Sequence, residues 1–322
     1  MRPRTALALA LALASCSRSE RAKERLFRPG EERAAPVAFD WSRPESSLRM
    51  GPDEVAARVG SFDWWGTVAW SAAPGRLGAR VQATERHRVR QLAGGDFFVE
   101  GDVDPGLGPG SEGGKRVIWA RGMAYARSRY AASGAWRERP TDRGRDARRF
   151  RDESFLVAAD IADLLGSGLK LVPQGEGTSL GRPVRRFGFA LDRAAFAPGP
   201  SRLGESPPGG AGDEDTKARL AFLDGREPVL AEGQLTADAA TGAPLEVRLH
   251  AAFRVKDDPD ARIDVDLSAR VTALGGAVAA VEPPPGALPD ERKPKGVARA
   301  LETAGLRKKK ASAEQEAEPE PE

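Results

Sequence analysis

The sequence predicts a mainly β (α+β) fold dominated by one antiparallel sheet. Apolar and polar residues alternate with a period of two in residues 245–255 and again in residues 263–271, which is the pattern of strands with one wet face. The turn-forming stretch 257–260 separates these two strands, so they are expected to pair as a hairpin. Inside the chain, residues 152–165 stand out as a helix.

The register of this hairpin is expected to be firm. A slip by one residue would turn six apolar side chains of the first strand into water. With the turn at residues 257–260, Arg254 is expected to lie opposite or diagonal to Asp264 or Asp266. Opposite charges in such positions help to fix the pairing of two strands.

A short helix over residues 52–59 is expected to open the folded domain. Pro52 suits the first helical turn, and Asp53 and Glu54 lie near the positive end of the helix dipole. Gly60 then ends the helix. From there the period becomes two, and further strands are expected at residues 61–70, 79–90, 97–100, 116–120, 123–127, 169–172, 183–191 and 229–236.

The helix at residues 152–165 is expected to cover the sheet. Acidic residues lie at its start, Gly166 closes it, and its apolar face is broad. A sheet of this size with so few helices either closes on itself or leaves an apolar groove. An acyl chain in such a groove needs no specific polar contact, because each buried methylene contributes about 0.8 kcal/mol.

The N-terminus has the pattern of an exported protein. Arg2 and Arg4 precede an alternating Ala-Leu run that is too short to span a bilayer and that ends in Ser15 and Cys16. This resembles a bacterial lipoprotein signal peptide with its lipobox. The resemblance implies cleavage before Cys16, with diacylglycerol and an N-acyl chain such as palmitate on that cysteine. The alternative is an ordinary secretory signal followed by an unmodified cysteine.

The domain organisation follows from these features. Residues 1–15 are expected to be the signal peptide and residues 16–50 an acylated, polar tether. Residues 51–290 form the β domain, with a flexible insertion at 197–217 that is rich in Pro, Gly and Ser. Residues 291–322 are expected to be a short helix and a disordered, charged tail.

Composition limits the function. The chain carries 50 Lys and Arg against 47 Asp and Glu, a net charge of +3, which does not favour nucleic-acid binding. Cys16 is the single cysteine, so an acylated chain has no thiol left for a disulfide. No cofactor, metal site or catalytic signature is expected, and we interpret the chain as a monomer and not an enzyme.

Three segments together resemble the periplasmic lipid and lipoprotein carriers of the LolA and LppX-LprG type. They are residues 119–140, residues 233–245 with a turn of the pattern D-x-x-T-G-x-P-L, and the strand that gives way to a loop at residues 281–284. The turn residues that match are Asp238, Thr241, Gly242, Pro244 and Leu245. The resemblance implies a strongly curved, incomplete β-barrel wrapped around a central helix, with a concave face that holds acyl chains.

The leading hypothesis is therefore an envelope lipoprotein that binds a lipid or the acyl chain of a lipoprotein in an apolar groove. Its role would be the transport of lipids or lipoproteins. The candidate groove residues are Phe62, Trp64, Val68, Trp70, Tyr125, Phe155, Leu156, Ile161, Leu164 and Leu165. The alternative is a structural or accessory lipoprotein with a filled core and no ligand. By resemblance, Ser17 after the cysteine favours anchoring at the outer membrane, facing the periplasm.

Two further features have simpler interpretations. His87 and His250 each stand alone on a strand, and we interpret them as surface or structural side chains. Residues 137–151 contain seven arginines, which could contact anionic headgroups, but we favour a solvated loop. The tryptophans of the early strands are expected to pack in the core, although some of them could line the groove.

Overall fold

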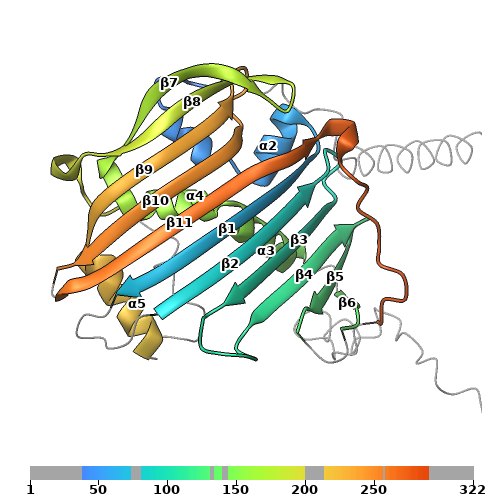
Figure 1. The fold of residues 1–322 in the computed structure, drawn as a ribbon. Helices are drawn as coiled ribbons and strands as arrows, with labels where there is room; N and C mark the ends of the chain where they lie inside the picture. The colour runs from blue at the N-terminus through green and yellow to red at the C-terminus, as the bar shows by residue number, and fades with distance from the viewer. Residues whose placement is uncertain are drawn as a thin grey trace, which may run out of the picture.

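The computed structural model describes residues 38–73, 81–130, 134–139, 144–199, 214–256 and 258–289. Eleven strands form one antiparallel sheet, in the order β6-β5-β4-β3-β2-β1-β11-β10-β9-β8-β7 (Figure 1). The strands are β1 (Phe62–Ala73), β2 (Val81–Gln91), β3 (Phe97–Asp104), β4 (Gly113–Ala120), β5 (Met123–Ser128), β6 (Arg137–Arg139), β7 (Leu169–Ser179), β8 (Arg182–Leu191), β9 (Arg226–Asp238), β10 (Pro244–Val255) and β11 (Asp258–Leu274).

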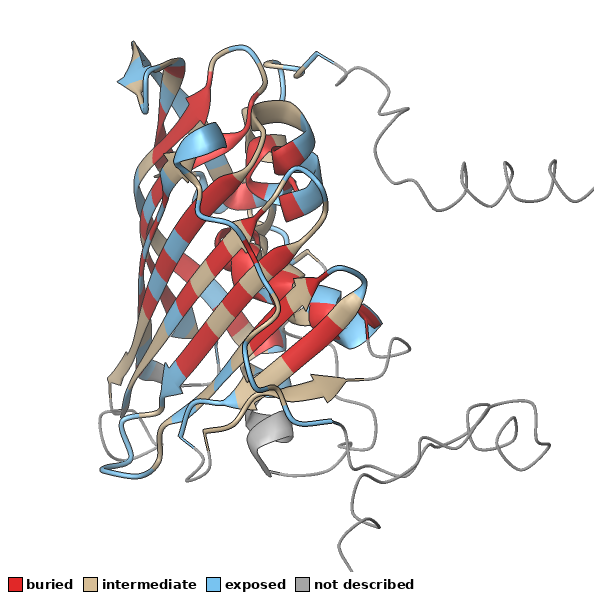
Figure 2. Ribbon diagram, turned by 90° about the vertical axis from the view of Figure 1, so that its right-hand side faces the viewer, coloured by how far each residue is buried: buried red, intermediate tan, exposed pale blue. Residues whose placement is uncertain are grey.

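The sheet is curved but not closed. Strand β1 lies in its middle and pairs with β2 on one side and β11 on the other, which joins the N-terminal and C-terminal halves. Strands β6 and β7 are the two edges. Figure 2 shows the sheet edge-on, with the helices gathered on its inner, concave side. The prediction of a mainly β, incompletely closed antiparallel sheet is confirmed.

Helices form a second layer on the concave face. They are η1 (Pro44–Arg49), α2 (Pro52–Val59), α3 (Gly144–Phe155), α4 (Val157–Leu165) and α5 (Glu214–Gly225). Short 3-10 turns η3 (Gly166–Gly168), η4 (Arg193–Ala195) and η6 (Gly275–Ala277) follow α4, β8 and β11. Helix α3 packs on β2, β3 and β4, and α4 packs on β9 and β10. None of the helices in the described part of the chain is long and apolar enough to cross a membrane.

The prediction of one central helix over residues 152–165 is wrong at its start and in its continuity. Helix α3 begins eight residues earlier, at Gly144, and Leu156 separates it from α4. The buried stripe of α3 includes Gly144, Ala147 and Arg151, which have the spacing of one helix face. Because this stripe is built from small residues and an arginine, it gave no apolar period in the sequence.

The boundary of the predicted tether also needs correction. Residues 38–50 were assigned to it, yet η1 buries Leu48, and Met50 follows it into the core. Trp41 stacks on Phe187 of β8 with ring centroids 5.6 Å apart. The folded domain therefore starts before residue 50. Cys16, the predicted signal peptide and the predicted C-terminal tail lie outside the described residues.

The insertion predicted at 197–217 is partly helical, because α5 begins at Glu214. Residues 200–213 lie outside the described part of the chain. Further along α5, Phe222 meets Phe253 of β10 edge to face, with centroids 5.9 Å apart, and Leu223 is buried. This end of the predicted insertion is therefore anchored on the core.

The hairpin of β10 and β11 forms as predicted, but β11 begins at Asp258, inside the predicted turn at residues 257–260. Arg254 lies opposite Arg262 and hence diagonal to Asp264, and His250 lies opposite Asp266. The His250 Nδ1 and the Asp266 carboxylate are 2.7 Å apart. Val265 and Leu267 point into the core, as the period of two requires.

A C-terminal strap, defined as residues 278–289, follows β11 and covers part of the outer face. Val281 packs in a second, smaller apolar cluster with Ile118 and Tyr125 of β4 and β5. Leu288 forms a parallel bridge to Arg137 of β6, with backbone hydrogen bonds of 2.8 and 2.9 Å to residues 138 and 136. The strap thus covers one edge of the sheet. At the other edge, β7 carries Pro173 followed by a register shift.

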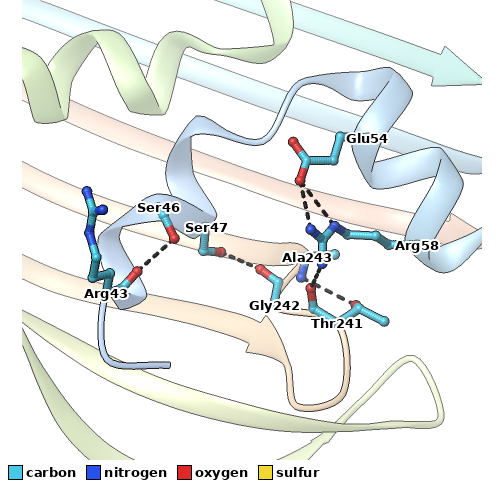
Figure 3. Close-up of polar contacts among 8 residues, drawn as sticks. All are labelled: Arg43, Ser46, Ser47, Glu54, Arg58, Thr241, Gly242 and Ala243. Carbon is cyan, nitrogen blue, oxygen red and sulfur yellow. Dashed lines mark hydrogen bonds and ion pairs between the residues drawn. The ribbon is translucent and has the colours of Figure 1, made fainter. Parts of the chain in front are cut away.

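The turn between β9 and β10 ties together three elements (Figure 3). Asp238 accepts hydrogen bonds from the backbone N–H and the hydroxyl of Thr241, at 2.9 and 2.7 Å. Arg58 of α2 donates to the Thr241 carbonyl at 2.8 Å, and Ser47 of η1 donates to the Gly242 carbonyl at 2.7 Å. The D-x-x-T-G motif of the sequence is therefore a docking point for the first two helices.

Replacing Asp238 by Asn is expected to lower the free energy of unfolding at neutral pH by about 2 kcal/mol. Asp238 is 1 % exposed. Burial alone would raise its pKa, but hydrogen bonds from Arg182 and Thr241 outweigh burial and hold the pKa below the ordinary value. The stability from this carboxylate is thus present above the unfolded-state pKa and is lost as the pH falls through the lower, folded-state pKa.

Urea denaturation at a series of pH values tests this expectation. The difference between the parent and Asp238→Asn should be largest near neutral pH and should shrink below pH about 4. The exposed Asp260→Asn change removes the same charge and serves as the control. A difference that stays constant from neutral to acidic pH would contradict the role assigned to the ionised carboxylate.

Candidate functional site

The sequence predicts a ligand groove on the concave face. Because side chains alternate between the two faces of β1, three of the candidate groove residues point toward this face. Phe62, Trp64 and Val68 point inward and are buried. The facing side chains come from the helices. Phe155, at the end of α3, lies with its ring centroid 5.1 Å from that of Trp64 and 5.4 Å from that of Phe62.

Most of the predicted groove residues do come together, but in a packed core. Ile161, Leu164 and Leu165 of α4 are almost fully buried and belong to the same cluster as the β1 side chains. Trp70 and Leu156 are partly buried and pack against this cluster. The concave face is therefore filled by the helices of the chain itself in this conformation.

Tyr125 is the exception. It belongs to the second cluster, with Ile118 and Val281, under the C-terminal strap on the outer face of the sheet. Its neighbours in the strand, Ala124 and Ala126, pack with the main core instead. Both faces of β5 are covered, so the alternation in this strand did not show which face is inside.

A small cavity remains at the junction of the helices with the sheet. Its volume is about 20 Å³, and its lining includes Trp64, Phe155, Ala158, Leu48 and Val247. A cavity of this size holds one water molecule. Pockets that bind small organic ligands are typically about 300–1,000 Å³, so this cavity does not accommodate an acyl chain as it stands.

A polar group borders the filled core on the same face. The Trp70 indole donates a hydrogen bond to Glu85 at 2.9 Å, and the other carboxylate oxygen of Glu85 lies 3.2 Å from His87 Nε2. His87 is 9 % exposed and sits near Phe150 of α3 and Gly101 of β3. The contacts of these side chains are with one another and with the core, which agrees with a structural His87.

The prediction of a solvated loop over residues 137–151 is wrong, because residues 137–139 form β6 and residues 144–151 lie in α3. Arg151 is buried, at 2 % exposed, and donates to both carboxylate oxygens of Asp53 at 2.9 and 2.8 Å. It also donates to Gln91 Oε1 at 2.8 Å, and its guanidinium lies 4.7 Å from the Phe97 ring centroid. Arg151 thus joins α3 to α2, β2 and β3.

The outer face of the sheet carries ion pairs and an exposed tryptophan. Trp65 is 46 % exposed on β1, and the Arg88 guanidinium lies 4.6 Å from its ring centroid. Burial alone would raise the pKa of Glu100, but hydrogen bonds from Arg116 and Arg129 outweigh it and lower that pKa. Trp64 and Val68 of β1 are buried on the inner face, so Trp65, between them in the strand, faces outward.

A shallow depression of about 380 Å³ also lies on the outer face, over β9, β10 and β11. Its lining includes Glu232, Gly233, Arg248, His250 and Asp266. In this lining His250 pairs with Asp266, as described above, and Arg248 lies 2.7 Å from Glu246. Among the described residues, no group of three or more His, Cys, Asp and Glu side chains could hold a metal ion.

No protein-family model matches the chain, and no curated protein matches it. Among solved structures, it is similar to a DUF1329 family protein from Desulfovibrio piger, with 10 % identity, a TM-score of 0.23, and coverage of 74 % of this chain and 95 % of that one. It is also similar to MucB in a complex with MucA(peri), with 15 % identity, a TM-score of 0.25, and coverage of 77 % of this chain and 60 % of that one.

A third similar structure is a putative outer membrane lipoprotein-sorting protein domain from Vibrio parahaemolyticus. The identity is 9 %, the TM-score is 0.22, and the alignment covers 72 % of this chain and 92 % of that one.

Proposed function

We propose that this chain is a non-catalytic accessory protein of the bacterial cell envelope, anchored through acyl groups on Cys16, with an interior filled by its own side chains. The main support for a filled interior is the burial of the predicted groove residues. The side chains predicted to line a groove, such as Trp64, Phe155 and Leu164, are buried against one another. A protein with such an interior contacts its partners through its surface.

The use of the buried polar side chains supports a non-catalytic role. Arg151 connects α3 with α2, and Asp238 holds the turn on which η1 and α2 dock. His87 is paired with Glu85 beside the core. These groups are engaged in contacts that hold elements together, which is the role expected of polar residues in a scaffold.

Acyl-chain binding is the second candidate, and the construction of the helical layer favours it. Two short helices of this layer, α3 and α4, are separated at Leu156. The small cavity lies beside this break, between Trp64 and Phe155. If α3 moved away, it would uncover the apolar side chains of Phe62 and Trp64 on β1, which Phe155 now contacts. Such side chains gain from contact with an acyl chain.

Native mass spectrometry of the protein purified from its own membrane separates the two candidates. A filled scaffold is expected to show only the mass of the protein with its covalent acyl groups. A carrier is expected to show additional, non-covalent lipid. A Cys16→Ser chain incubated with a labelled long-chain fatty acid provides a second test, and uptake of one equivalent would overturn the scaffold in favour of the carrier.

Replacing Cys16 by Ser is expected to release a folded, soluble domain, because Cys16 precedes the first described residue of the fold by 22 positions. Cell fractionation after a high-salt wash measures the release, and circular dichroism checks that the β signal is unchanged. A variant that stays with the membrane after the wash would show that the cysteine is not the anchor.

A further inference from the structure

The crest of the outer face is formed by the middle of the sheet. Strand β1 has five strands on each side of it, and the sheet curves around the helices on the opposite face (Figures 1 and 2). The outer face is therefore convex, with β1 along its most prominent line. Trp65 lies on this line, with nearly half of its side chain exposed, and Thr67 follows on the same face.

Arginines surround Trp65 on both neighbouring strands. Arg88 of β2 and Arg270 of β11 are its direct cross-strand partners. Arg86 and Arg90 lie two residues to either side of Arg88 and so share its face. Asp63 is the carboxylate among them, and it accepts hydrogen bonds of 2.8–3.1 Å from both Arg88 and Arg90. Glu100 of β3 lies opposite Arg88 and is paired with Arg116 and Arg129.

Arg86 and Arg270 are exposed, and the acidic residues opposite them are engaged elsewhere. Asp102, opposite Arg86, is buried and paired with Arg129. Glu246, opposite Arg270, lies 2.7 Å from Arg248. Within the described contacts, these two guanidinium groups are therefore available to an anion from outside.

We propose that this crest, formed by Trp65, Arg86, Arg88 and Arg270, binds the anionic headgroups of a phospholipid bilayer. Guanidinium groups pair with phosphate oxygens, and an exposed indole suits the boundary between headgroups and acyl chains. A convex crest touches a flat bilayer over a small area. A stable protein partner, in contrast, buries about 800 Å² on each side.

The biological setting of this contact rests on the proposed anchor at Cys16. The 22 residues between Cys16 and Phe39 can span at most about 70 Å. That length exceeds the radius of gyration of roughly 18 Å expected for a domain of this size, so the crest can reach the bilayer that holds the anchor. Tethering also raises the effective concentration, and a weak contact is then sufficient to orient the domain.

Vesicle co-sedimentation of the Cys16→Ser chain tests the proposal without any contribution from the anchor. The chain is expected to bind vesicles of phosphatidylglycerol and phosphatidylethanolamine but not vesicles of phosphatidylcholine. High salt is expected to release it from the anionic vesicles. The double variant Arg86→Gln/Arg270→Gln is expected to lower the partition coefficient roughly thirtyfold. The matched control is Arg254→Gln/Lys256→Gln, which removes two exposed cations at the far end of β10.

Trp65→Phe provides an independent readout. Brominated anionic lipids should quench the tryptophan emission of the parent chain, and most of this quenching should be lost in the Trp65→Phe variant. The proposal is overturned if the parent does not bind anionic vesicles, or if the control pair loses as much binding as the crest pair. Binding to soluble polyglutamate but not to vesicles would overturn it in favour of an acidic protein partner. None of these results depends on whether Cys16 is acylated.

Discussion

Replacing Arg151 by Met is expected to lower the free energy of unfolding by about 3 kcal/mol. Methionine has a similar length, but it cannot donate hydrogen bonds to Asp53 and Gln91. Gln91 is 1 % exposed and would lose its partner in a place that water does not reach. Asp53 is largely exposed, so water can hydrate its carboxylate once Arg151 is gone. The loss of stability therefore stays near the lower end of the range for broken buried ion pairs.

Urea denaturation of the Cys16→Ser chain, followed by circular dichroism, measures this effect. Arg148→Met is the matched control, because Arg148 lies on the exposed side of the same helix, 5.3 Å from the Trp119 ring centroid. It is expected to change stability by less than about 1 kcal/mol. Equal effects of the two substitutions would show that Arg151 contributes no more than an exposed arginine does.

Replacing Gly242 by Ala is expected to destabilise the fold by about 3 kcal/mol, for two separate reasons. The φ angle of Gly242 is +70°, which L-residues other than glycine rarely adopt. A Cβ at this position would also lie 2.1 Å from Cγ of Phe39. The substitution therefore strains the turn between β9 and β10 and pushes away the segment that precedes η1.

A double-mutant cycle separates the two costs. In a Phe39→Ala background the clash is gone, and Gly242→Ala should then cost only the backbone strain, about 1–2 kcal/mol. Gly94→Ala is the control, since a Cβ there meets no atom within 4 Å and its φ is not positive. Strictly additive effects of Phe39→Ala and Gly242→Ala would contradict the contact between the two residues.

Local patterns in the sequence predicted much of the sheet. Strands β10 and β11 were predictable because one face of each is wet, so their alternation is complete and the turn between them fixes the pairing. Helix α2 was predictable from its proline, its acids and Gly60. These elements carry their own start and stop signals, and they do not depend on contacts far away in the chain.

The remaining features depend on contacts that no local pattern encodes. The start of α3 was missed because Gly144 and Arg151 occupy its buried face, Gly144 against the Trp119 ring and Arg151 against Asp53. The face of Tyr125 was missed because the strap covers the outer side of β5. The sequence also did not show whether the concave face is open or filled. That depends on how α3 and α4 pack on the sheet, and the strands have the same alternation of apolar and polar residues in both cases.

The two edge strands of the sheet determine whether neighbouring copies of the protein on a membrane surface can pair with one another. An unpaired strand edge is a template for polymerisation. The lipid anchor that we propose would concentrate such edges in one plane. Here the C-terminal strap occupies one border, and Pro173 with its register shift interrupts the other. We therefore expect neighbouring molecules to diffuse past one another without assembling into continuous β ribbons.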